Sequence, residues 1–70
     1  MTVTTATTRL RLMREALGVS QAELARRMRL DRSLVSRAER GRIATWPRFR
    51  RDAADALGID EGLLFPEYER

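Results

Sequence analysis

The chain consists of short amphipathic segments, each bounded by residues that start or stop an α-helix. Leu10, Met13 and Leu17 fall on one side of a helical projection, with Ala6 one turn earlier, and Gly18 then ends the period. A helix this short is marginal by itself and is stabilised by packing its apolar face against neighbours. The pattern therefore predicts several short helices around one shared core.

The second segment carries a capping-box spacing, with Ser20 and Glu23 in S-x-x-E. This spacing predicts a helix that begins at Gln21 and buries Leu24, Ala25 and Met28. The connection "RLD" follows, with Leu30 turned inward. Asp31 is a favoured N-cap residue, so we expect a third helix from Arg32 to about Arg40, with Gly41 as its left-handed stop.

Two further helices are predicted in the last third of the chain. Pro47 suits a first helical turn, and five residues of "TWPRFRRDAADALG" form a core-facing arc: Trp46, Phe49, Ala53, Ala56 and Leu57. The opposite face offers two pairs at i,i+4 spacing, Arg48 with Asp52 and Arg51 with Asp55. A last helix, "EGLLF", would be capped by Asp60 and ended by Pro66. The predicted fold class is all-α, with five short helices.

Composition limits the chemistry that the chain can perform. Seventy residues make one small domain with little room for a large pocket. Cysteine and histidine are absent, which excludes disulfides, thiolate nucleophiles, imidazole bases and the usual zinc ligands. We therefore expect no enzyme, no cofactor, no metal and no small-molecule ligand. With neither a signal peptide in "MTVTTATT" nor a long apolar run, we expect a soluble cytoplasmic protein without a membrane partner.

Charge indicates an acidic partner. All 14 basic residues are arginine, and the net charge is +4. An acidic polymer is the natural partner of such a chain, although the charge could also serve solubility alone.

The predicted third helix separates its residue types by side. One arc of about 140° contains only arginine and serine, in Arg32, Ser33, Ser36, Arg37 and Arg40. The helix would be anchored through Leu34, Val35 and Ala38, and Glu39 lies at the boundary. A solvated face usually mixes charge signs, whereas this arc has no acid. A B-DNA major groove admits one helix, and arginine can bond guanine O6 and N7 in bidentate fashion, so this face fits that groove.

The beginning of the predicted second helix fits a phosphate. Its free backbone N–H groups and the positive end of its dipole favour an anion, and Gln21 can add a side-chain donor. Read alone, Gln21 is equally an ordinary first-turn residue.

The order and spacing of several pieces resemble the phage repressor and Cro family, also called the XRE-type regulators. The pieces are "LMREALGVSQAELA", "DRSLVSRAERG", "ALGI" and "LLFP", and they extend over residues 10–65. The resemblance implies a compact five-helix lambda-repressor-like domain whose second and third helices form a helix-turn-helix. It divides the chain into a flexible segment 1–8, a DNA-binding domain 9–66 and a tail 67–70.

The resemblance also implies roles for residues that match the family's pattern. The base-reading positions fall on Arg32, Ser33 and Arg37, with Ser36 as a lesser candidate. The phosphate contacts fall on Gln21, Arg40 and Arg42, and on the backbone from Thr45 to Pro47. Arg48 is a minor-groove candidate, which its pairing with Asp52 would disfavour. Arg14 and Glu39 match a structural ion pair between the first and third helices.

Three residues or segments depart from the family pattern. Arg29 stands where the turn often has glycine, so either this residue takes a positive φ or the turn has another form. Arg50 replaces a common leucine of the fourth helix, and the apolar role shifts to Trp46 and Phe49. The loop "RIATW" lacks the basic residues common there.

The expected function is that of a sequence-specific double-stranded DNA-binding transcriptional regulator, of repressor type and of bacterial or phage origin, associated with the nucleoid. One module reads few base pairs, so we expect a two-fold homodimer on a near-palindromic operator, including a dimer that forms only on DNA. The alternative is an antitoxin or co-regulator that uses the same fold to hold a protein partner.

Overall fold

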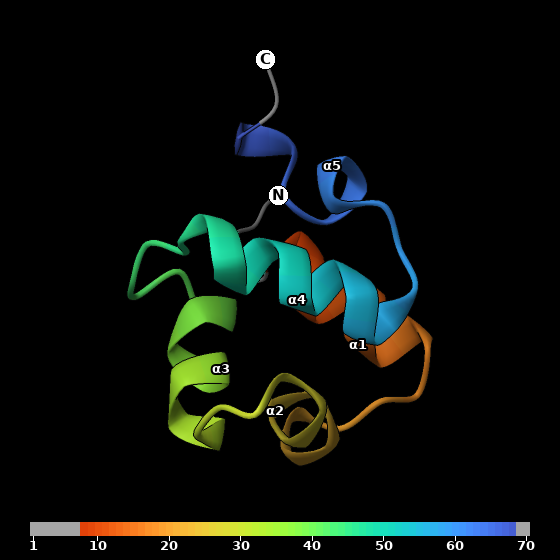
Figure 1. Ribbon diagram of the computed structural model, residues 1–70, viewed down its shortest axis with the longest axis vertical. Helices are drawn as coiled ribbons and strands as arrows, with labels where there is room; N and C mark the ends of the chain where they lie inside the picture. The colour runs from red at the N-terminus through yellow and green to blue at the C-terminus, as the bar shows by residue number, and fades with distance from the viewer. Residues whose placement is uncertain (1–7, 69–70) are drawn as a thin grey trace, which may run out of the picture.

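A computed structural model describes residues 8–68 of the chain and contains five α-helices in that part. They are α1 (Arg9–Ala16), α2 (Gln21–Met28), α3 (Arg32–Glu39), α4 (Pro47–Leu57) and α5 (Glu61–Leu64), followed by the 3₁₀ turn η1 (Pro66–Tyr68) (Figure 1). Residues 8–68 contain no β-strand. The predicted all-α class and the order of five short helices are confirmed.

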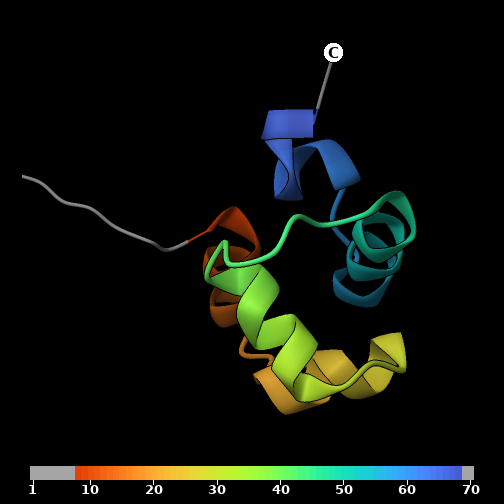
Figure 2. The same ribbon diagram turned by 90° about the vertical axis from the view of Figure 1, so that its left-hand side faces the viewer.

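The helices enclose the core from several sides. Helices α1 and α4 lie on opposite sides of the molecule, α2 and α3 close one end, and α5 with η1 lies at the other end (Figures 1 and 2). Helix α2 packs against both α3 and α4, and α5 packs against α1 and α4. Because α3 is held at one end of this framework, its outer face is left free on the surface (Figure 2).

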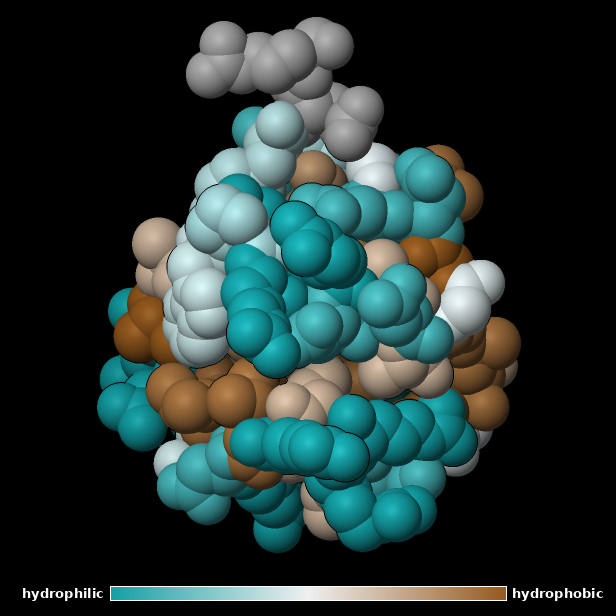
Figure 3. Space-filling model, in the orientation of Figure 1, coloured by the Kyte–Doolittle hydropathy of each residue, from teal (hydrophilic) through white to brown (hydrophobic). Residues whose placement is uncertain are grey.

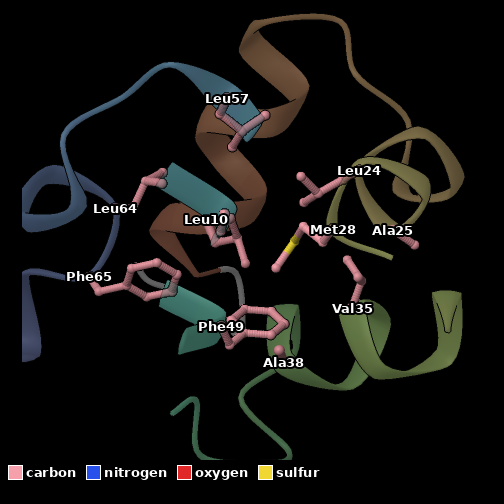
Figure 4. Close-up of a cluster of buried hydrophobic side chains, with 11 residues drawn as sticks. Leu10, Leu24, Ala25, Met28, Val35, Ala38, Phe49, Leu57, Leu64 and Phe65 are labelled. Carbon is pink, nitrogen blue, oxygen red and sulfur yellow. The ribbon is translucent and has the colours of Figure 1, made fainter. Parts of the chain in front are cut away.

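The core combines residues of all five helices with Phe65 (Figure 4). Phe49 is fully buried in it, with its ring 5.1 Å from that of Trp46 and 6.4 Å from that of Phe65, between ring centroids. Full burial of one large apolar side chain contributes about 1.5–3 kcal/mol. The core residues are Leu10, Leu24, Ala25, Met28, Val35, Ala38, Phe49, Ala53, Leu57, Leu64 and Phe65.

Two residues predicted for the core lie at the surface instead. Leu17 is 51% exposed because α1 ends at Ala16, and the chain turns at Leu17 and Gly18 so that Val19 packs on the core. Trp46 is 38% exposed because it precedes the first turn of α4 as its N-cap residue. Both residues lie just beyond a helix end, where the helical periodicity no longer determines which way a side chain points.

Most of the predicted helix boundaries and caps are observed, and Asp31 is the exception among the predicted side-chain caps. Ser20 accepts a hydrogen bond from the N–H of Glu23 at 3.0 Å, as the capping box requires. The Glu23 carboxylate accepts from Arg26 at 2.6 Å and Arg27 at 2.8 Å. Asp31 is the N-cap residue of α3, but its side chain makes no capping hydrogen bond. Helix α3 ends one residue before the predicted end, and Gly41 takes the predicted positive φ of 72°.

Arg29 occupies a left-handed conformation at the end of α2, with φ 59° and ψ 41°. It is the only non-glycine residue with a positive φ in residues 8–68. The following N–H, of Leu30, donates to Ala25 O at 2.9 Å and closes the turn. The sequence left open whether Arg29 takes a positive φ or the turn has another form, and the structure shows the positive φ.

The outer face of α4 is paired only in part. Arg48 Nε lies 3.5 Å from Asp52 Oδ2, as the spacing predicts. Arg51 and Asp55 form no ion pair, so that prediction is wrong; both side chains are exposed, where such a pair stabilises little. Helix α5 ends at Leu64, and Pro66 begins η1 rather than following the helix directly.

The N-terminal prediction falls mostly outside the described residues, since both Ala6 and the rest of 1–7 lie there. Thr8, the first described residue, is the N-cap of α1, and its hydroxyl accepts from the N–H of Arg11 at 3.3 Å. None of the helices in residues 8–68 has the length and apolar character that crossing a bilayer requires.

Candidate nucleic-acid interface

Helix α3 presents a polar face to solvent and buries its opposite side. Val35, Ala38 and Glu39 are buried beneath it, and Leu34 is half-buried. The exposed side carries the predicted reading residues: Arg32, Ser33 and Arg37 are exposed, and Ser36 is half-buried. All four thus lie on the outer side of α3, with Ser36 at its more covered edge.

Hydrogen bonds link part of this face along the helix. Arg37 Nε donates to Ser33 O at 3.3 Å, and Arg37 Nη2 lies 3.5 Å from Ser33 Oγ. Ser33 Oγ in turn donates to Asp31 Oδ2 at 2.8 Å. The two bonds of Arg37 to Ser33 are long and exposed, so they hold its guanidinium only weakly. The guanidinium can therefore turn toward another partner at a small cost in free energy. The sequence predicted Asp31 only as a cap, whereas in the structure its carboxylate lies beside the arginine and serine face of α3.

The arginines divide into paired and unpaired groups. Within residues 8–68, carboxylates pair with Arg11, Arg14, Arg26, Arg27, Arg48 and Arg50. The arginines of α3 and of the turn after it have no ion pair with any residue of this range: Arg32, Arg37, Arg40 and Arg42. Arg9, Arg29 and Arg51 also lack a carboxylate partner there, but they lie on other elements. Uncompensated positive charge is thus most concentrated along α3 and its C-terminal turn.

A buried ion pair fixes α3 against α1. Arg14 Nε donates to Glu39 Oε2 at 2.6 Å, and Arg14 Nη2 donates to Glu39 Oε1 at 3.0 Å. Arg14 is 6% exposed and Glu39 is fully buried. The hydrogen bonds to Glu39 raise the pKa of Arg14, against the opposing effect of burial. Glu39 is therefore a structural residue that fixes the orientation of α3 relative to α1.

The same carboxylate holds the first residue of α2. Gln21 Nε2 donates to Glu39 Oε1 at 3.0 Å, and Arg14 Nη1 donates to Val19 O at 2.6 Å. Gln21 is half-buried, so the network fixes the start of α2 and its side chain together. Sequence reasoning assigned Gln21 to phosphate and Glu39 to Arg14 but did not find the bond between them. Gln21 keeps one amide hydrogen and its oxygen for a further partner.

The loop between α3 and α4 carries most of the remaining phosphate candidates. Arg40 and Arg42 are exposed at its beginning, and Thr45 is half-buried near its end. Helix α4 then starts at Pro47 without a side-chain capping bond, which leaves its first amides available. Arg48 is on the exposed face of the first turn, with its side chain 83% exposed.

A groove of about 920 Å³ lies on the surface between the C-terminal end of α2 and α4. Its hydrophobic floor is the brown band that crosses Figure 3 between two hydrophilic strips. The lining mixes Arg27, Arg29 and Arg48 with Asp52 and Asp55. Charges of both signs distinguish this groove from the arginine and serine face of α3.

Comparison with known proteins identifies a family. A family described as a helix-turn-helix domain matches residues 7–64, which include α1 to α5. No curated protein and no solved structure matches the chain significantly. The matched range contains the α2–turn–α3 unit, so the helix-turn-helix prediction is confirmed.

Proposed function

Because the chain belongs to the helix-turn-helix domain family, we propose that it is a sequence-specific transcriptional regulator of repressor type that binds double-stranded DNA. Helix α3 lies in the major groove, and α2 crosses the DNA backbone with its N-terminus toward a phosphate. The observation that carries the proposal is the concentration on α3 and the turn after it of exposed arginines that form no ion pair within residues 8–68.

Base reading falls to the exposed face of α3. Arg32 and Arg37 can each form a bidentate contact with guanine, and Ser33 and Ser36 can contact several base edges. The Ser33 hydroxyl proton is already donated to Asp31, so Ser33 offers its oxygen as an acceptor. Each good arginine contact with guanine supplies about 1–3 kcal/mol of discrimination between bases.

Phosphate binding falls to residues at the two ends of the helix-turn-helix. Gln21 and the first amides of α2 serve one side, and Arg40 and Arg42 serve the other, together with Thr45 and the start of α4. These contacts fix the register of α3 without choosing a sequence. Arg48 is the minor-groove candidate: its exposed side chain can leave Asp52 readily, because the Nε to Oδ2 distance is 3.5 Å.

The regulator binds as a two-fold dimer on a near-palindromic operator. One α3 reads only a few base pairs, and two copies one helical turn apart double the number of base contacts. The two copies need not form a dimer in solution, because a dimer that forms only on the operator is sufficient for this mode of binding.

Selection from a randomised duplex library tests the proposal. We expect one near-palindromic sequence to be enriched, and its logarithmic binding constant to fall linearly with the logarithm of salt concentration. A matched scrambled duplex serves as the control and should bind more weakly at every salt concentration. Equal affinity for the two duplexes would contradict the proposed function.

A further inference from the structure

Arg50 is an arginine placed inside the fold rather than on the DNA-facing surface. Its side chain is only 12% exposed, and it extends from the first turn of α4 toward the preceding loop. Its Nη1 donates to Thr45 O at 2.8 Å and to Thr45 Oγ1 at 3.1 Å. One guanidinium nitrogen thus holds both oxygen atoms of a single loop residue.

The other sides of this guanidinium face the C-terminal part of the chain. Arg50 Cζ lies 3.8 Å from the centroid of the Tyr68 ring, in a cation–π contact. Arg50 Nε is buried and makes no hydrogen bond in residues 8–68, and Glu61 Oε2 is 3.8 Å away from it. Glu61 therefore compensates the charge without a hydrogen bond, and the Tyr68 ring covers the guanidinium.

The bonds to Arg50 determine what Thr45 can still offer. A guanidinium only donates, so Thr45 Oγ1 is used as an acceptor and its hydroxyl proton is left to donate elsewhere. The backbone N–H of Thr45 also has no acceptor in the described part of the chain. Because Arg50 already holds the carbonyl oxygen, the two groups that Thr45 can still offer, its N–H and its hydroxyl, are both hydrogen-bond donors. A phosphate group can accept a hydrogen bond from each of them.

We propose that Arg50 positions Thr45 to bind one operator phosphate, and that Tyr68 holds Arg50 in place, so that η1 takes part in DNA binding. This inference rests on the proposed function. Arg50 touches no DNA in this arrangement, and it acts through the conformation of Thr45.

Replacing single phosphates of the selected operator by neutral methylphosphonates tests the inference. A hydrogen bond to a charged group is worth about 1.5–3 kcal/mol, so the wild-type protein should lose about 10-fold or more in affinity at the phosphate that Thr45 contacts. Arg50→Leu should lose less than about 2-fold at that phosphate and should keep the wild-type losses at the others. Circular dichroism should show the variant folded, since leucine suits a half-buried helix position.

Arg51→Leu is the matched control, because it removes the same charge from the next residue of α4, at an exposed position without a bond to the loop. It should keep the 10-fold sensitivity. An Arg50→Leu profile identical with that of the wild type at every phosphate would overturn the inference. Failure of the wild-type protein to select any operator would instead overturn the proposed function.

Variants of Tyr68 keep the inference testable if Arg50→Leu does not fold. Tyr68 is 43% exposed, so its replacement leaves the core intact. Tyr68→Ala should reduce the sensitivity at the same phosphate, whereas Tyr68→Phe, which keeps a ring over Arg50, should preserve it. A wild-type profile in Tyr68→Ala would show that η1 has no part in DNA binding.

Discussion

Removing one partner of the Arg14–Glu39 ion pair should remove a large share of the protein's stability, whereas replacing both partners should remove less. Glu39 is fully buried and accepts two hydrogen bonds from Arg14 and one from Gln21. In Arg14→Met the carboxylate keeps only Gln21, and in Glu39→Leu the guanidinium keeps only Val19 O as a close acceptor. Leaving one charge of such a pair buried costs about 3–5 kcal/mol. A domain of this length has a total stability of about 4–10 kcal/mol, so each loss is a large share of it.

The double variant Arg14→Met with Glu39→Leu should be more stable than either single variant, because no uncompensated charge remains. Urea unfolding followed by circular dichroism measures all four free energies of unfolding, and their differences give the coupling energy. Arg48→Met with Asp52→Leu is the control: this pair on α4 has a 3.5 Å contact but side chains 83% and 36% exposed, so its loss should cost below about 1 kcal/mol. Single-variant losses near 1 kcal/mol, or a double variant whose loss equals their sum, would refute the reasoning.

Two further predictions concern other positions. Arg29→Gly should stabilise the fold by about 0.5–1 kcal/mol. Relief of the left-handed conformation is worth about 1–2 kcal/mol, which exceeds the cost of the entropy that glycine adds to the unfolded chain. An unchanged urea midpoint would contradict this prediction. Hydrogen bonds from Arg26 and then Arg27 lower the pKa of Glu23 below its ordinary 4.5. The ionised Glu23 carboxylate therefore stabilises the fold above pH 4.5, and this stabilisation is lost as the pH falls through the lower folded pKa. Glu23→Gln should accordingly make the free energy of unfolding less dependent on pH below 4.5. An unaltered acid unfolding curve would show that the Glu23 pairs contribute nothing to stability.

Sequence predicted the helices well because their periods and stop residues are local. Gln21 as the first residue of α2, and Gly41 as the left-handed residue after α3, follow from neighbours within one turn. The errors at Leu17 and Trp46 arise where a helix ends, since the tertiary direction of the chain there depends on distant contacts.

The candidate site was predictable where it depended on one helix and less so where it depended on several. The arc of Arg32 and Arg37 on α3 follows from helical geometry alone. The bond between Gln21 and Glu39 joins α2 to α3, and the contacts of Arg50 join the loop to η1. No local pattern encodes such pairs, although the presence of Arg50 at an expected leucine position was a signal that this region had its own interactions.

Binding profiles of three alanine variants test the central claim most directly, namely that α3 reads bases while the turn after it binds phosphates. Affinities are measured for the selected operator and for its single base-pair variants. Arg32→Ala and Arg37→Ala should each lose preference at one base pair per half-site, by about 1–3 kcal/mol, and keep it elsewhere. Arg42→Ala should weaken every duplex alike and lower the salt slope by about 1 per protomer. A uniform loss of affinity in all three variants, with base preferences unchanged, would contradict the claim.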